Sequence, residues 1–368
     1  FYNLGMLKKF TVSNFKNFEK DLTLDLTSSN YEFNDSAVID GVVKNSIIYG
    51  YNGSGKSNIV KAMMDITTHL TDFEVDHKRD SHYLCLNSKE EYASFKYTFN
   101  FEGKELIYSY KKKNSSNVFD EKILIDSKKV LVSEEKSLSL RGAENLVLDY
   151  DSSISFVKYV NSNTILDNED TNVIVFKKFV SFVKGMLSFN SLEGNTYQGL
   201  EKGSEPLNDI ILKHGDVHEF QEFLKAAGVN YTLRISNING DDRIVVVWEN
   251  DKEVDIFNVA SKGTKALILF YTWLLKFDKV SMVFMDEFDS YYHNDLTKFV
   301  IKKVKESGVQ SLFSSHNTSV MSNDILRPDC YFILKNNKIS SLDKTTTKEL
   351  RRAHNLEKMY KAGAFKNV

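Results

Sequence analysis

The sequence predicts an α/β fold: a mixed sheet core with an antiparallel β subdomain and a helical insertion. Three observations predict it. The apolar run 46–49 ends in a glycine-rich loop that opens a segment with helical periodicity. Apolar and polar residues alternate on both sides of a tight turn at 102–104, which is typical of an antiparallel hairpin. After residue 265, apolar helix patterns alternate with short apolar strands, the rhythm of an α/β core.

Each element follows from its local pattern. Two antiparallel strands are expected before the glycine-rich loop, at 10–18 and 22–26. Alternation predicts hairpins at 95–110 and 123–132, and strands at 231–235 and 244–248. Helical spacing of apolar residues predicts helices that include 176–183, 220–224, 266–277 and 295–306. Apolar runs predict buried strands at 282–285 and 311–314, and a last hairpin at 331–342. The polar, glycine-bearing stretch 190–205 predicts a mobile loop.

We expect these elements to form four successive regions. The first and last are the two parts of one core, and the two between them are attached to it. The regions are the N-terminal part of the core (6–90), the antiparallel β subdomain (91–153), the helical insertion with flanking strands (154–250), and the C-terminal part of the core with its tail (251–368).

Length, charge, cysteine content and apolar runs limit the class of protein. The 368 residues can bury one large core or two modest ones. A net charge of −2 neither favours nor excludes a nucleic-acid partner, because a local basic patch can lie on a neutral protein. Cys85 and Cys330 match no metal-ligand spacing and suggest no disulfide framework, so a cytoplasmic protein is expected. The sequence has no apolar run long enough to span a bilayer, so no membrane partner is expected.

The glycine-rich loop has the full spacing of a phosphate-binding P-loop between a strand and a helix. Lys56 would reach the β- and γ-phosphates of a nucleotide, and the Ser57 hydroxyl would ligate Mg²⁺. Lys16, in an early turn, is a further candidate for a phosphate contact, although on sequence alone a solvated turn lysine explains it better. The candidate nucleotide-binding residues of the loop are Gly50, Asn52, Gly53, Ser54, Gly55, Lys56 and Ser57.

A second motif has the Walker B form, an apolar strand that ends in two carboxylates. Asp286 would hold the metal, directly or through water, and Glu287 would orient and polarise the attacking water. A strand that ends in two surface acids is the alternative, and the P-loop upstream makes it the weaker one. His316 ends the next strand, where its ring could hydrogen-bond a γ-phosphate; a purely structural histidine is the alternative.

A serine and a glycine precede the long apolar helix at 266–277. Ser261 and Gly263 could bind a phosphate through a side chain, backbone N–H groups and the helix dipole. An ordinary helix cap formed by Ser261 or Thr264 explains the same residues equally well.

The order of these motifs resembles the ABC-type ATPases, and the chain is most similar to the soluble branch that contains RecF, SMC proteins and the overcoming-lysogenisation ATPases. The stretch 14–18 resembles the N-terminal strand of that branch. The run 286–289, with His293 and the tail 349–365, resembles bacterial anti-phage and abortive-infection ATPases, of which the AbiL type, encoded beside a RloB-like protein, is the most similar. The resemblance covers the N-terminal third of the core and nearly everything after residue 255.

The resemblance implies how the site works. Such ATPases bind ATP with Mg²⁺ and form head-to-tail homodimers or higher even oligomers, so Ser261 and Gly263 would act in trans on the ATP of the partner. Asp289 would lie in the loop that communicates between the two sites. Two departures stand out. The signature reads Ala-Ser-Lys-Gly-Thr, and the family's Q-loop glutamine is either Gln198 or absent.

Three functions are compatible with this pattern. The first is an ATPase that senses infection or DNA and controls a separate nuclease or toxin, RloB-like or of the TOPRIM type, because too little sequence follows His316 for a nuclease domain. The second is a DNA repair or chromosome-maintenance ATPase, although no heptad run long enough for an SMC coiled coil is present. The third is a scaffold that binds ATP with negligible turnover. Candidate DNA contacts are the lysine runs 111–113, 128–129, 177–178, and 302–303 with Lys305.

Overall fold

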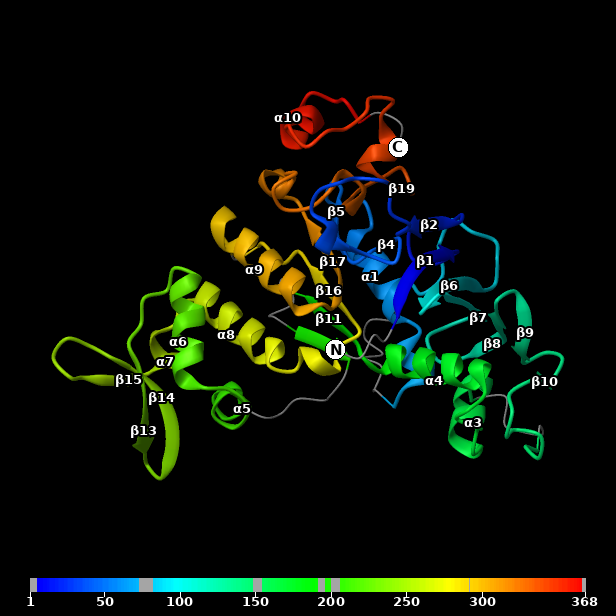
Figure 1. Cartoon of the computed structure of the whole chain (residues 1–368), viewed down its shortest axis with the longest axis horizontal. Helices are drawn as coiled ribbons and strands as arrows, with labels where there is room; N and C mark the ends of the chain where they lie inside the picture. Colours follow the sequence, from blue (N-terminus) through cyan, green and yellow to red (C-terminus); the bar gives the residue numbers. More distant parts are fainter. Residues whose placement is uncertain are drawn as a thin grey trace.

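Two seven-stranded sheets organise the chain in the computed structural model, which describes residues 5–72, 82–147, 154–190, 196–199, 206–290 and 292–365 (Figure 1). The central sheet has the order β12-β11-β16-β17-β5-β18-β19. The five inner strands are parallel, and the two edge strands run antiparallel to them. The strands are β5 (Asn45–Tyr49), β11 (Met186–Asn190), β12 (Thr196–Gly199), β16 (Met282–Asp286), β17 (Gln310–Ser315), β18 (Tyr331–Lys335) and β19 (Lys338–Ser341).

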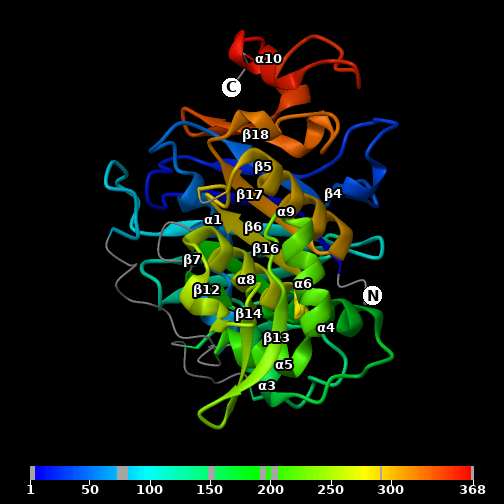
Figure 2. The ribbon, with the colours of Figure 1, turned by 90° about the vertical axis from the view of Figure 1, so that its left-hand side faces the viewer.

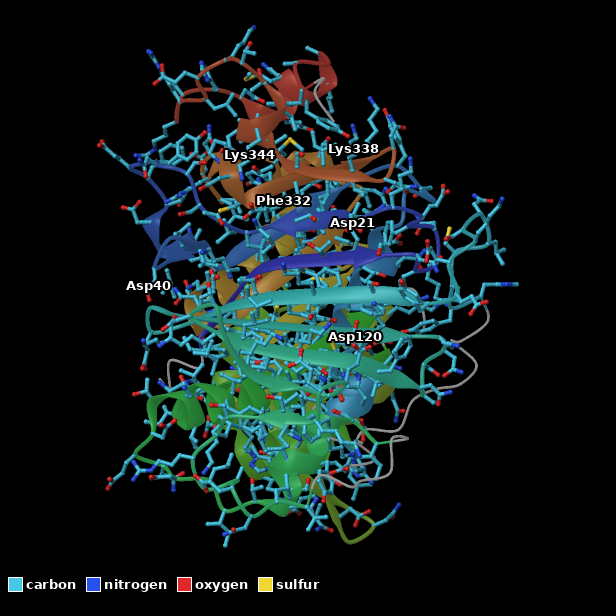
Figure 3. The ribbon with its side chains drawn as sticks, turned by 90° about the vertical axis from the view of Figure 1, so that its right-hand side faces the viewer. Asp21, Asp40, Asp120, Phe332, Lys338 and Lys344 are labelled. Carbon is cyan, nitrogen blue, oxygen red and sulfur yellow. The ribbon has the colours of Figure 1, made fainter. Side chains whose placement is uncertain are left out.

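The second sheet is antiparallel throughout, with the order β10-β9-β8-β7-β6-β1-β2. Figure 3 looks onto it, with Asp120 on β8; the β18–β19 hairpin of the central sheet, which carries Phe332 and Lys338, lies above it in this view. Its strands are β1 (Met6–Ser13), β2 (Leu22–Asp25), β6 (Ala93–Phe101), β7 (Lys104–Lys112), β8 (Val118–Ile125), β9 (Lys128–Val132) and β10 (Ser137–Leu138). Both predicted hairpins of this region are confirmed.

Aromatic side chains fill the inner face of the antiparallel sheet. Alternate residues of β6 point inward and are at most 1% exposed, from Phe95 to Phe101. The Phe99 ring lies 5.4 Å from Phe179 and 5.2 Å from Phe182, both on helix α4 (Thr171–Lys184). The phenylalanine-rich helix predicted at 176–183 is therefore part of the core.

Helix α1 (Lys56–Met64) lies between the two sheets. It contacts β16 and β11 of the central sheet, while the Tyr97 hydroxyl from β6 donates to the carbonyls of Ala62 and Met63 at 3.0 and 3.2 Å. These carbonyls belong to the last turn of the helix, where the Ala62 carbonyl also accepts from the Asp65 N–H at 3.3 Å. The antiparallel sheet thus holds the C-terminal end of α1, and the N-terminal end is left at the edge of the central sheet.

A buried ion pair completes this attachment. Asp65 follows α1 directly and accepts from the Lys112 ammonium at 2.9 Å, with 0% of the lysine and 5% of the aspartate side chain exposed. The hydroxyls of Tyr83 and Tyr110 donate to the same carboxylate at 2.9 and 2.8 Å. Lys112 also donates to Thr68 at 2.6 Å. Every partner of this carboxylate comes from outside α1, so the network fixes the helix to the antiparallel sheet.

One glutamine joins the two sheets. The side-chain amide of Gln310, the first residue of β17, accepts from the Leu7 N–H and donates to the Leu7 carbonyl, both at 2.8 Å. It also donates to the Val43 carbonyl at 3.2 Å. Gln310 therefore bonds both backbone groups of Leu7, beside the stretch 9–12 of β1 that pairs with β2.

The remaining elements surround these sheets. Helices α8 (Lys262–Leu274) and α9 (Asn294–Ser307) lie on the side of the central sheet away from the antiparallel sheet (Figure 1). Figure 2 shows α6 beside α8, with β13 and β14 of the small sheet β13–β14–β15 on the side that faces the viewer. The others are α2 (Thr67–Leu70), β3 (Val38–Ile39), β4 (Val42–Val43), α3 (Phe156–Asn163), α5 (Leu207–His214), α6 (Val217–Ala226), β13 (Leu233–Ile238), β14 (Asp241–Val247), β15 (Glu253–Asp255), α7 (Ile256–Val259) and α10 (Leu356–Lys361).

The region boundaries differ from the expected ones in two places. The first two strands belong to the antiparallel sheet, because β1 pairs with β6. The stretch 154–250 contributes β11 and β12 to the central sheet. Part of the predicted loop 190–205 therefore forms strand β12, and residues 191–195 and 200–205 lie outside the described residues. Among the described residues, no helix has both the length and the apolar character that a bilayer crossing requires.

Several predicted DNA contacts are occupied within the chain. Lys112 is wrong as a phosphate contact, because it is buried on Asp65. Lys111 pairs with Asp120 at 2.9 Å, and Lys178 with Glu102 at 2.6 Å. Lys112 is buried because of its position on β7: side chains alternate between the two faces of a strand, and Lys112 shares a face with the buried Tyr108 and Tyr110.

We expect Lys112→Met to destabilise the fold by about 3–5 kcal/mol, because it leaves the Asp65 carboxylate buried without its cation. Urea unfolding followed by circular dichroism measures the loss. The control is Lys104→Met, which breaks the exposed Lys104–Asp126 pair and should cost at most about 1 kcal/mol. Equal losses in the two variants would contradict a structural role for the buried pair.

Candidate nucleotide-binding site

The glycine-rich loop connects β5 to α1 at the carboxyl edge of the central sheet. Gly53 and Gly55 have φ of 76° and 104°, which favour glycine. No side chain fits at Gly50, because a Cβ there would lie 2.8 Å from the Leu334 carbonyl oxygen. Gly55 precedes α1 without a side-chain cap, which leaves the first N–H groups of the helix open to an anion. Asn52 is exposed on the same loop.

Lys56 is the first residue of α1 and is only 4% exposed. Its ammonium donates to the Gly50 carbonyl at 3.0 Å and lies 2.8 Å from Nε2 of His316. Burial lowers the pKa of Lys56, and the negative charges of Glu287 and Asp286 oppose this shift. The cation therefore lies where three segments distant in sequence meet.

The Walker B residues reach the same place from the end of β16. Oε1 of Glu287 lies 3.3 Å from Nε2 of His316, so the imidazole lies between the glutamate and the Lys56 ammonium. Glu287 has a φ of 47°, a left-handed conformation that costs of order 1–3 kcal/mol for a non-glycine residue and often marks a functional site. Asp286 is 4% exposed at the end of its strand.

Two serines of β17 hold these carboxylates, and the sequence did not single them out. Ser314 Oγ donates to Asp286 at 2.5 Å and accepts from the Glu287 N–H at 2.8 Å. Ser315 Oγ donates to Asp289 at 2.6 Å. Burial raises the pKa of Asp289, and the Ser315 hydrogen bond opposes that shift. The only available signal was that both serines immediately precede His316.

The candidates outside this cluster have local partners. Lys16 lies in a tight turn, with its ammonium 5.8 Å from the centre of the Phe15 ring. Ser261 caps α8 and accepts from the Thr264 N–H at 3.1 Å, which confirms the helix-cap alternative for its side chain. Among the described residues, no hydrogen bond joins Ser261 or Gly263 to the loop 50–57. His293 caps α9 in the same way, accepting from the Leu296 N–H at 3.3 Å.

The loop residues fit a nucleoside triphosphate with Mg²⁺. Ser54 Oγ is buried and has no hydrogen-bond partner among the described residues, so the loop holds an unsatisfied polar group. Mg²⁺ prefers few carboxylates together with phosphate oxygens and water. Ser57 and Asp286 match that preference, and the described residues contain no group of three His, Cys, Asp or Glu side chains that could hold a metal alone.

The sequence profile of one family matches residues 46–322, more than half of the chain. That family is described as "AAA domain, putative AbiEii toxin, Type IV TA system". The chain belongs to this family. No curated protein sequence matches the chain.

Three solved structures are similar to the chain. The SMC head domain from Thermotoga maritima is 16% identical, with 91% of this chain and 97% of that chain covered and a TM-score of 0.45. An SMC head bound to the C-terminal winged-helix domain of ScpA is 15% identical, with coverage of 92% and 98% and a TM-score of 0.48. An SMC head with an extended coiled coil, bound to the C-terminal domain of ScpA derived from Pyrococcus furiosus, is 14% identical, with coverage of 92% and 97% and a TM-score of 0.45.

The chain is an α/β P-loop ATPase domain of ABC type. Its own topology has the features of that class: a P-loop after β5, the Walker B strand β16 two positions away in the same parallel sheet, and an antiparallel sheet packed on the P-loop helix. Strand β17 lies between them and ends at His316. In an open parallel sheet, ligands bind beyond the carboxyl ends of the strands, where these three segments lie.

Proposed function

We propose that this chain hydrolyses ATP at the carboxyl edge of its central sheet and that ATP holds two copies of the chain head to tail. One observation carries the proposal: Lys56, Glu287 and His316 converge within hydrogen-bond distance although they come from three separate segments. A cation to neutralise phosphate, a carboxylate to polarise water and a ring to contact the γ-phosphate are the parts that phosphoryl transfer to water needs.

Each residue has a distinct task in this proposal. The N–H groups of Gly53–Lys56 and the Lys56 ammonium bind the β- and γ-phosphates. Ser57 and Asp286 are the residues that would hold Mg²⁺, whose chemistry here is to neutralise charge on the transferred phosphoryl group. Glu287 accepts a hydrogen bond from the attacking water and orients it.

His316 would exchange partners when the nucleotide binds. Its Nε2 lies between Lys56 and Glu287, so a phosphate bound to Lys56 is within reach of the ring. Asp289, held by Ser315 of the same strand end, would pass the state of His316 to the partner copy. Ser261 and Gly263 are the residues that we assign to the ATP of that partner.

The first test is Glu287→Gln, which keeps the shape of the side chain but removes the negative charge that polarises water. We expect phosphate release to fall at least about a hundredfold, the range of a general base, while ATP binding is retained. Release is measured by a coupled phosphate assay, and dimerisation by light scattering with ATP. Glu306→Gln, on the exposed end of α9, is the matched control. An unchanged rate in Glu287→Gln would reject the catalytic role.

The second test asks whether the site is completed in trans. Lys56→Ala should abolish ATP binding, and Ser261→Arg should block the surface offered to the partner copy, so each variant alone should be inactive. A mixture of the two can form one intact site per mixed dimer and should regain activity. Asn355→Ala, which removes the side-chain cap of α10, controls for the loss of a helix cap. A mixture that stays inactive would contradict head-to-tail closure.

We further propose that the ATPase controls a separate nuclease or toxin in anti-phage defence, and that it belongs to the AbiL subgroup. The family description, which names a toxin of a toxin–antitoxin system, supports a link to growth arrest. Direct DNA sensing is part of this proposal, through lysines such as Lys128, which is exposed and has no ion pair with another described residue.

Controlled expression in bacteria tests the effector proposal. The chain alone should leave growth unchanged, whereas co-expression with the product of a neighbouring gene should arrest growth after phage infection. The same pair with Lys56→Ala should not, because it cannot bind ATP. Arrest caused by the chain alone would show that the toxic activity is its own and would contradict a separate effector.

A further inference from the structure

A short, tightly held turn lies beside the phosphate loop. The backbone N–H of Phe15 donates to the Phe18 carbonyl at 3.0 Å, and Phe18 N–H donates back to Phe15 at 2.8 Å. Lys16 and Asn17 are the two residues at the tip, and Lys16 has a φ of 53°. The Asn14 amide anchors the base of the turn by donating to the carbonyls of residues 90 and 92, both at 2.8 Å.

The side chain of Asn17 contacts three segments at once. Its Oδ1 accepts from Asn58 Nδ2, in the first turn of α1, at 2.7 Å. Its Nδ2 donates to the Ser54 carbonyl in the phosphate loop at 3.4 Å and to Asn337 Oδ1 in the β18–β19 turn at 3.3 Å. The Asn17 amide thus accepts a hydrogen bond from the first turn of α1 and donates hydrogen bonds to the phosphate loop and to the β18–β19 turn.

The loop is shaped to fit against this amide. A Cβ on Gly55 would lie 2.6 Å from Nδ2 of Asn17 and 3.0 Å from the Phe18 ring. A glycine is therefore required at position 55 for two reasons: a side chain would block the close approach of Asn17, and the φ of 104° favours glycine. Loop and turn are complementary surfaces, and the contact does not depend on a bound nucleotide.

We propose that Asn17 is a positioning residue for the nucleotide: it holds Ser54 and Gly55 against the first turn of α1, so that the loop N–H groups stay directed at the phosphates. The inference rests on the proposed ATPase function. Asn17 itself touches neither Glu287 nor His316 in any contact among the described residues. It therefore acts on binding, because a loop that must be ordered on binding pays an entropic cost that a preorganised loop avoids.

The consequence is a separation of two kinetic constants. Without the Asn17 amide, the loop samples more conformations and ATP binds more weakly. Once ATP is bound, the water-activating Glu287 is unaffected. KM should therefore rise while kcat at saturating ATP stays the same, the pattern of lost binding that is equal in ground and transition states.

The experiment compares wild type, Asn17→Ala, Asn58→Ala and the double variant. Binding of the non-hydrolysable ATP analogue AMP-PNP with Mg²⁺ is measured by calorimetry, and steady-state hydrolysis gives KM and kcat. We expect Asn17→Ala to weaken binding about tenfold, the loss of a hydrogen bond or two, with kcat within about twofold. Because Asn58 acts through Asn17, the double variant should be no weaker than Asn17→Ala alone.

The control is Asn163→Ala, an exposed asparagine whose amide also donates to a backbone carbonyl, but on α3. Unchanged AMP-PNP binding in Asn17→Ala, a fall in kcat with unchanged KM, or additive effects of Asn17 and Asn58 would each overturn the inference. Should Asn17→Ala fail to fold, Asn58→Ala removes the same bond from the helix side and carries the test. A wild type that binds no AMP-PNP refutes the proposed function, whereas tight wild-type binding matched by Asn17→Ala refutes only the inference.

Discussion

A buried cation at the end of a parallel sheet is the constraint on which the site depends. The Lys56 ammonium has little contact with water, so its charge must be compensated by the protein. The Gly50 carbonyl and the carboxylates at the end of β16 supply that compensation. Their positions follow from adjacent parallel strands, which bring loops far apart in sequence to one edge. A nucleotide would take over this task with its own phosphate charges.

The two ends of α1 are held in different ways. The C-terminal end is fixed by tyrosine hydroxyls and by the Asp65–Lys112 pair, all anchored in the antiparallel sheet. The N-terminal end carries Lys56 and contacts the turn that presents Asn17. That turn follows β1 of the same antiparallel sheet. One sheet thus supports the helix at both ends, and the P-loop is held by a frame outside the parallel core.

Motifs whose function depends on spacing could be predicted from the sequence, because spacing is visible there. The P-loop follows β5, the Walker B residues end β16 and His316 follows β17, so all three lie at the carboxyl edge of the parallel sheet. Features that depend on tertiary neighbours could not. Strand β11 carries no glycine or acid that marks it, and only its pairing with β16 makes it part of the core. Lys112 is the middle one of three consecutive lysines, so the sequence does not show that it shares the buried face of Tyr108 and Tyr110. Ser314 and Asn17 acquire their partners only when distant segments meet.

The bonds between Leu7 and Gln310 span 303 positions of the chain, so the first strand meets its last partner only when most of the polypeptide exists. On a translating ribosome, β2 emerges soon after β1 and can pair with one of its edges, but the other edge waits for β6 and the Leu7 backbone waits for Gln310 of β17. Such distant pairings make folding slow and leave strand edges open to other chains for longer. In the nascent protein, the edge of β1 that pairs with β6 is therefore open until residues 93–101 have been made.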